Sequence, residues 1–169
     1  MPVADFRRRA FSAANVNAAG RNVGREVYWK LYAVENLVRV VIHSVLAAQI
    51  GPDWWTLSVN QHLQDKVAEF RARYAKRPWH GAPGQHGIYY TFLSDLSAII
   101  TAHIHLFRPV IADIDQWVLR LELILLPRNI VGHMNWPDRT DRQRIDVFYA
   151  DFRALVKKLA SAGFNLVIP

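Results

Sequence analysis

Apolar residues recur at intervals of three and four along most of this chain, which is the spacing of one face of an α-helix. The clearest stripe consists of Val27, Leu31, Val34, Val38, Val41 and Val45. No stretch alternates between apolar and polar residues for long enough to require a β-strand. The pattern therefore predicts an all-α fold, a bundle of four or five helices.

Turn residues and capping residues mark the expected ends of these helices. We expect helices over residues 23–50, 54–74, 89–107, 113–126 and 141–160. Asp53 and Thr140 are the expected N-caps of the second and the last helix. The segment RPWHGAPGQHG, residues 77–87, holds three glycines and two prolines and is therefore expected to be a loop.

The length and the composition favour one packed domain. The chain has 169 residues, of which 51% are apolar. Residues 1–20 show weak periodicity and are interpreted as a loose N-terminal arm with room for one short helix. Residues 21–169 then form a single helical domain.

Several classes of protein are not indicated. The chain has no cysteine, so neither a disulfide framework nor a thiolate metal site is expected. No unbroken apolar run reaches the roughly 18 residues of a membrane span, and no apolar segment follows Arg7–Arg9 as in a secretory signal. We expect a cytoplasmic protein that makes no membrane contact.

The charge balance points to a polyanionic partner. The formal net charge is +7, and 16 of the 21 basic residues are arginine. The planar guanidinium suits phosphate better than the point charge of lysine. RNA or DNA is therefore the expected partner, although a basic balance can also serve solubility alone.

The histidines do not predict a metal site. His103 and His105 are two residues apart, which places them on different faces of a helix. The chain has no HExxH motif, and His80 and His86 flank a flexible loop without an acidic neighbour. We expect neither a metal nor another cofactor.

The segment RNIVGH, residues 128–133, places polar residues directly after the apolar run LELILLP. Asn129 and His133 are four apart and share a helical face, whereas Arg128 lies about 140° away around an ideal helix. Gly132 leaves room for a close approach. The segment is either a small reactive cluster or an ordinary solvated helix end.

Pro127 immediately precedes this segment and has two interpretations. It either kinks the fourth helix or begins a new one at the first-turn position. In the second case, Arg128 and Asn129 lie in a first turn whose free N–H groups attract phosphate.

A second polar group lies on the first long helix, whose surface is otherwise apolar. Glu35, Arg39 and His43 are spaced by four residues, and Glu before Arg at this spacing favours an ion pair. A solvated face is the preferred interpretation for His43. For Glu35, Asn36 and Arg39, a solvated face and the lining of a polar cleft remain equal alternatives.

These segments together resemble the HEPN superfamily, whose domains are helical bundles. RNIVGH matches the R-x4-6-H signature of that superfamily. YWKLYAVENLVRVVIHSVL followed by GPDWW is similar to the first helix and turn of one HEPN subgroup. YYTFLSDLSAII and the helix start at Asp113 are also similar, so that the resemblance covers roughly residues 27–159.

The resemblance implies a metal-independent ribonuclease that dimerises to form its active cleft. Arg128 and His133 would be the catalytic pair, supported by Asn129, while Glu35, Asn36 and Arg39 would line the cleft or bind RNA. It also implies a role as a toxin or phage-defence effector, with an inhibitory or antitoxin partner. Some HEPN domains serve only as RNA-binding, dimerisation or adaptor modules, and this remains the alternative.

Overall fold

The computed structural model describes residues 12–167 and 169, and every regular element within them is a helix. The longer helices are α3 (Trp29–Gln49), α5 (Gln61–Ala75), α6 (Leu93–Ala102), α8 (Ile114–Gly132) and α9 (Arg139–Ser161). The shorter elements are α2 (Val16–Val23), the π-helix η1 (Gly24–Tyr28), α4 (Trp54–Ser58), the 3₁₀-helix η2 (Gly87–Tyr90) and α7 (Ile104–Phe107). The predicted all-α bundle is confirmed.

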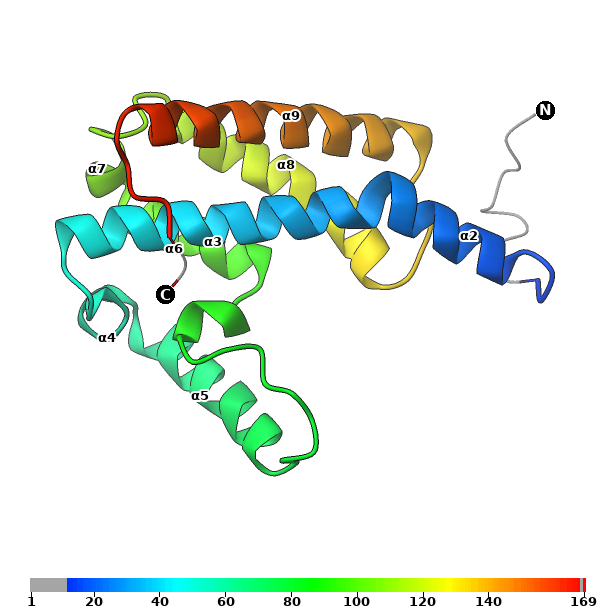
Figure 1. Cartoon of the computed structure of the whole chain (residues 1–169), viewed down its shortest axis with the longest axis horizontal. Coiled ribbons are helices and arrows are strands. Elements are labelled where there is room, and N and C mark those ends of the chain that lie inside the picture. The colour runs from blue at the N-terminus through cyan, green and yellow to red at the C-terminus, as the bar shows by residue number, and fades with distance from the viewer. Residues whose placement is uncertain (1–11, 168) are drawn as a thin grey trace.

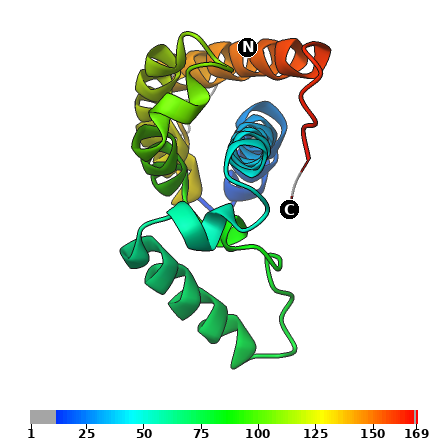
Figure 2. The same ribbon diagram turned by 90° about the vertical axis from the view of Figure 1, so that its left-hand side faces the viewer.

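Helix α3 is the central element of the bundle. Figure 1 shows it running the length of the molecule below α9, and it packs against both α9 and α6. In Figure 2, which looks along α3, α9 lies on one side and α6 and α8 lie on another. Helix α8 packs against α6 and α9 and thereby closes the bundle.

The predicted apolar stripe of α3 forms the centre of the core. Its six members are each at most 8% exposed. On the opposite side of the core, Trp117 of α8 packs edge-on against Phe152 of α9, with 5.5 Å between the ring centroids. Each buried apolar side chain of this size contributes about 1.5–3 kcal/mol, so burial of the periodic positions stabilises the contacts between the helices.

The helix between residues 54 and 74 was expected to be continuous, and this is wrong. It breaks at Val59, where the chain is extended, and restarts as α5. Asn60 caps the new helix because its side-chain oxygen accepts a hydrogen bond from the Leu63 N–H at 2.9 Å. Asp53 makes no such side-chain bond.

Two other helix starts differ from the expected ones. Helix α9 is capped by Asp138, whose carboxylate accepts from the Asp141 N–H at 2.8 Å, and not by Thr140. Helix α6 begins at Leu93, because η2 and an extended Thr91 precede it. At α9, a carboxylate that reaches a free N–H decides the boundary.

The predicted arm over residues 1–20 lies partly outside the described residues, which begin at residue 12. Within the described part, residues 16–20 belong to helix α2, the short helix for which the prediction left room. Helix α2 continues through η1 into α3 without a break. The helical domain therefore begins earlier than residue 21.

One helical stretch among the described residues, Val16–Gln49, is long and apolar enough to cross a membrane by length and hydropathy. It includes α3, whose side chains Val38, Ile42 and Val45 are at most 1% exposed. Here these apolar residues are covered by α6 and α9.

Helix α5 and the loop over residues 77–87 project from the bundle (Figures 1 and 2). The predicted loop is confirmed, since no helix or strand occupies residues 77–86. Its end is anchored where Gly87 lies against Trp55: a β-carbon on Gly87 would come within 2.2 Å of the indole. Only glycine permits this close approach.

Candidate functional site: a cleft beside Arg128

Arg39 connects α3 to the segment that leads into α6. Its Nε donates to the carbonyl of Ile88 at 3.2 Å, and its Nη2 donates to the carbonyl of Thr91 at 2.9 Å. Nη1 donates to the Asn36 side chain at 3.2 Å. Arg39 is 9% exposed. Because each of its three nitrogens already has a protein acceptor, Arg39 positions its neighbours and has little capacity to bind a ligand.

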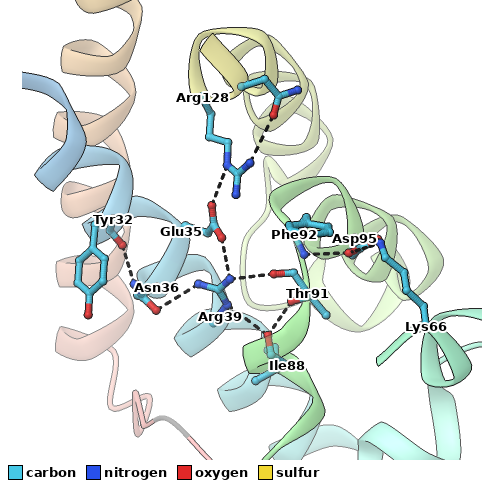
Figure 3. A network of polar contacts seen from close by, with 11 residues as sticks. Tyr32, Glu35, Asn36, Arg39, Lys66, Ile88, Thr91, Phe92, Asp95 and Arg128 are labelled. Carbon is cyan, nitrogen blue, oxygen red and sulfur yellow. Dashed lines mark hydrogen bonds and ion pairs between the residues drawn. The ribbon is translucent and has the colours of Figure 1, made fainter. Parts of the chain in front are cut away.

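Glu35 joins two arginines from different parts of the chain. One carboxylate oxygen accepts from Arg39 Nη2 at 2.7 Å, and the other accepts from Arg128 Nε at 3.1 Å. Figure 3 shows this carboxylate between the two guanidinium groups. One negative charge therefore faces two positive charges, and the site keeps a net positive charge.

A cleft of about 380 Å³ opens beside this network, and we call it the Arg128 cleft. It is lined by Tyr28, Leu31, Tyr32, Glu35, Asn36, Arg39, Pro83, Tyr89, Arg128, Val131 and Gly132. Three of these residues are tyrosines, whose rings can stack on nucleobases. The structure thus places Glu35, Asn36 and Arg39 in the wall of a cleft and not on a solvated face.

Arg128 retains hydrogen-bonding capacity toward this cleft. Its side chain is 26% exposed. Nη1 lies 3.4 Å from the Asn129 side-chain oxygen, and within the described residues Nη2 has no hydrogen-bond partner. A planar guanidinium with free N–H groups is suited to bind an oxyanion.

Gly132 provides the space in which the Arg128 guanidinium lies. A β-carbon at this position would be 3.4 Å from Arg128 Nη1, which is ordinary contact distance. A larger side chain would therefore compete with the guanidinium for the same space. The room expected beside Gly132 is taken by Arg128.

Helix α8 passes through Pro127 and continues to Gly132. The interpretation in which Pro127 begins a new helix is therefore wrong, and Arg128 and Asn129 do not lie in a first turn. Their backbone N–H groups are not free in the way that phosphate binding at a helix start requires. Any anion at this site must be bound through side chains.

His133 caps the C-terminal end of α8. The Met134 N–H donates to the Val131 carbonyl and the Asn135 N–H donates to the Ile130 carbonyl, both at 2.9 Å. This is a Schellman motif with Met134 in the left-handed position, φ 60°. The motif fixes the backbone of His133, and the side chain is exposed.

Within one chain, His133 lies outside the cleft that Arg128 lines. Arg128 lines the cleft and contacts Glu35, whereas His133 is not among the lining residues. Their five-residue separation on a helix corresponds to about 140° of rotation. The structure brings Arg128 together with Glu35, Asn36 and Arg39, but it does not bring His133 into that group.

His133 instead continues a row of exposed apolar residues on α8. Leu119, Leu123 and Leu126 are 52%, 68% and 73% exposed. Leu119, Leu123, Leu126, Ile130 and His133 follow one another at spacings of four, three, four and three residues. These five residues therefore share one face of the helix. We call this face the α8 leucine row.

A third cluster joins the base of α4 to the end of the 77–87 loop. The Trp54 Nε1–H donates to His43 Nδ1 at 3.0 Å, and the rings of His43 and His86 lie 5.6 Å apart. The solvated position expected for His43 is therefore wrong. His86 is more than forty positions from His43 in the sequence, so no local pattern indicated this contact.

Burial lowers the pKa of His43 and, with greater effect, that of His86. For His86 the pKa falls to about 4, first because of burial and then because of the positive charges of His43 and Arg71. Both imidazoles are therefore neutral at pH 7. Across residues 12–167, no three His, Asp or Glu side chains converge as a metal site would require.

Comparisons of the chain with protein-family models, with curated proteins and with solved structures find no match. The HEPN resemblance consequently rests on the sequence segments that carry it.

Proposed function

We propose that the chain binds RNA and cleaves it without a metal ion, as the HEPN resemblance implies. Arg128 holds the scissile phosphate, and His133 transfers protons. The nucleophile is the 2′-hydroxyl of the RNA itself, which His133 deprotonates, and the 5′-oxygen leaves after accepting a proton. Guanidinium groups stabilise the extra negative charge of the pentacoordinate state.

The observation that carries this proposal is the shared carboxylate of Glu35. Since Arg39 and Arg128 both bind it, the cleft keeps one positive charge in excess, and Arg128 has an unpaired Nη2 within the described residues. The lining tyrosines add surfaces for unpaired bases. A cationic, aromatic cleft of this kind suits a single-stranded polyanion.

The position of His133 favours a two-fold homodimer. Acid and base are two tasks, and a neutral and a protonated imidazole from two copies would perform both. The α8 leucine row leads directly to His133, and exposed leucines of this extent favour burial against a partner. Packing of two copies near the His133 ends of their rows would bring the two imidazoles into one interface.

A non-catalytic RNA-binding or adaptor module is the second candidate. The observation that favours it is that His133 does not line the cleft that Arg128 lines within one chain. In this case the cleft binds RNA, the leucine row binds a partner, and no bond is broken. The proposed role as a toxin or phage-defence effector, restrained by an inhibitory partner, belongs only to the catalytic candidate.

Cleavage assays on matched substrates distinguish the two candidates. We expect the purified chain to cut single-stranded RNA and to leave DNA of the same sequence intact, because DNA lacks the attacking hydroxyl. Arg128→Lys should be impaired, since a point charge does not replace the planar fork. Binding of RNA without cleavage by the wild-type chain would select the adaptor. Equal cleavage of DNA would refute the proposed mechanism.

A second test uses the host cell. Expression of the wild-type chain should slow growth, and either Arg128→Ala or His133→Ala should relieve this effect if cleavage causes it. Growth inhibition that persists unchanged in both variants would contradict the catalytic candidate.

A further inference from the structure

A second cationic groove lies beside the Arg128 cleft, between the N-terminal end of α3 and the start of α9. Its volume is about 470 Å³. Its wall includes Arg25 of η1, Trp29 and Lys30 of α3, and Arg139 and Arg142 of α9. We call it the α3–α9 groove, and the function proposed for the Arg128 cleft assigns it no role.

The cations of this groove outnumber its carboxylates. Arg142 binds Glu26 at 3.0 Å, and Lys30 binds Asp146. Arg25 and Arg139 are exposed, and neither guanidinium has an ion-pair or hydrogen-bond partner among residues 12–167. Two planar forks are therefore free to bind an anion, and arginine is suited to do this with two parallel hydrogen bonds to a phosphate.

An exposed indole lies between these charges. Trp29 is 43% exposed. Its Nε1–H donates to the Arg25 carbonyl at 2.7 Å, and its ring packs edge-on against Tyr149 with 5.0 Å between centroids. The ring is thus held in place while part of its surface faces solvent. Such a ring provides a stacking surface for an unpaired base, at about 1–3 kcal/mol per base.

The α3–α9 groove and the Arg128 cleft are neighbours around α3. Trp29 lines the first and Tyr32 lines the second, and these residues are three apart on the same helix. Tyr32 is 63% exposed, so the ridge between the two hollows carries exposed aromatic rings. A flexible strand can cross this ridge without losing contact with the protein.

We propose that the α3–α9 groove binds the backbone of single-stranded RNA and leads the strand over Trp29 and Tyr32 to Arg128. Arg25 and Arg139 hold phosphates, and Trp29 stacks on a base. The occupant is single-stranded because paired bases do not present their faces for stacking. This inference rests on the proposal that RNA is the ligand of the chain.

The test measures binding separately from cleavage. The full chain carrying His133→Ala is titrated against a fluorescein-labelled, unstructured RNA 12-mer, and anisotropy is recorded at several salt concentrations. Arg25→Glu/Arg139→Glu is compared with Lys157→Glu/Lys158→Glu, which makes the same charge change on an exposed part of α9 outside the groove. Circular dichroism confirms that each variant is folded.

We expect the groove variant to raise Kd at least about tenfold and to reduce the salt slope by about two, one for each lost phosphate contact. The control variant should change Kd by less than about threefold, because it alters only the long-range field. Trp29→Ala should weaken binding while leaving the salt slope unchanged, since stacking releases no counterions. Equal losses in the two charge variants would mean that net charge alone attracts RNA, and no loss in the groove variant would also overturn the inference.

These binding results test the groove inference independently of whether the chain cleaves RNA. If the groove variant binds RNA as tightly as its parent while the wild-type chain still cleaves, the groove inference fails and the nuclease proposal stands. If the groove variant loses binding but the wild-type chain never cleaves, the groove inference stands and the nuclease proposal fails. Tighter binding of a blunt duplex than of the 12-mer would contradict the single-stranded assignment.

Discussion

Arg128 Nε lies 3.1 Å from a carboxylate oxygen of Glu35, a residue 93 positions earlier in the chain. This contact ties the end of α8 to the N-terminal half of α3. It also divides the two arginines of the site by role, because Arg39 is buried and fully bonded whereas Arg128 has a free Nη2 within the described residues. Arg39 therefore contributes mainly to the stability of the fold, whereas Arg128 is available to bind a ligand.

Glu35→Gln should destabilise the fold far more than Arg128→Gln does. Removing the carboxylate leaves Arg39 charged and buried without a counterion, at a cost of about 2–3 kcal/mol. Arg128 is at the cleft surface, so its loss should cost less than about 1 kcal/mol. Urea denaturation followed by circular dichroism measures both changes. Equal destabilisation by the two substitutions would mean that the roles are not divided in this way.

Met134→Gly should stabilise the end of α8. Met134 has φ 60° and is 83% exposed, so its side chain contributes little packing. A left-handed conformation costs an L-residue roughly 1–2 kcal/mol, and glycine avoids this strain. Part of the stabilisation is offset because glycine loses more conformational entropy on folding. The expected net stabilisation is a few tenths to about 1 kcal/mol. Thermal unfolding with an unchanged or lower midpoint would argue against the strained cap.

Acidification should weaken the fold through His86. Its pKa is lowered from 6.5 to about 4 in the folded chain. The unfolded chain therefore binds a proton between pH 6.5 and 4 that the folded chain does not, and the free energy of unfolding falls as the pH drops through this window. His86→Gln should make the pH dependence shallower.

The control for this prediction is His105→Gln, a histidine exposed on α7. It removes a histidine without touching the contacts of His86, so it controls for the substitution itself. Burial lowers the pKa of His43 as well, so part of the dependence should remain in His86→Gln. Identical slopes for His86→Gln and the wild type would show that His86 does not contribute.

The α8 leucine row should mediate self-association. Leu123→Asp/Leu126→Asp places two charges in the row and should convert a dimer to a monomer, as seen by light scattering. Leu57→Asp alters a leucine on α4 that is 70% exposed, and it should leave the mass unchanged. A wild-type chain that is monomeric at micromolar concentrations would contradict the proposed homodimer.

Local periodicity accounts for the parts of the fold that were predictable. The stripe from Val27 to Val45 identified α3 because burial on one face imposes the helical period directly on the sequence. The same logic placed Asn129 and His133 on one helical segment. Periodicity does not define the helix boundaries, because the cap at Asn60 depends on one side chain that reaches one N–H.

Tertiary contacts explain what the sequence did not predict. Arg39 is buried because the carbonyls of Ile88 and Thr91 come within reach, and nothing near Arg39 in the sequence indicates them. His43 likewise meets His86 through the path of the 77–87 loop. His133 lies outside the Arg128 cleft. The five-residue spacing corresponds to a helical angle only because α8 continues through Pro127, which the sequence left open.

The ends that RNA cleavage leaves distinguish the proposed mechanism from a metal-dependent one. The wild-type chain and His133→Ala are incubated with single-stranded RNA in EDTA, and the new 3′ ends are identified. We predict cleavage by the wild type that leaves a 2′,3′-cyclic phosphate, and a rate about 10²–10⁴-fold lower for His133→Ala with RNA binding retained. Loss of cleavage in EDTA, or undiminished cleavage by His133→Ala, would contradict the account.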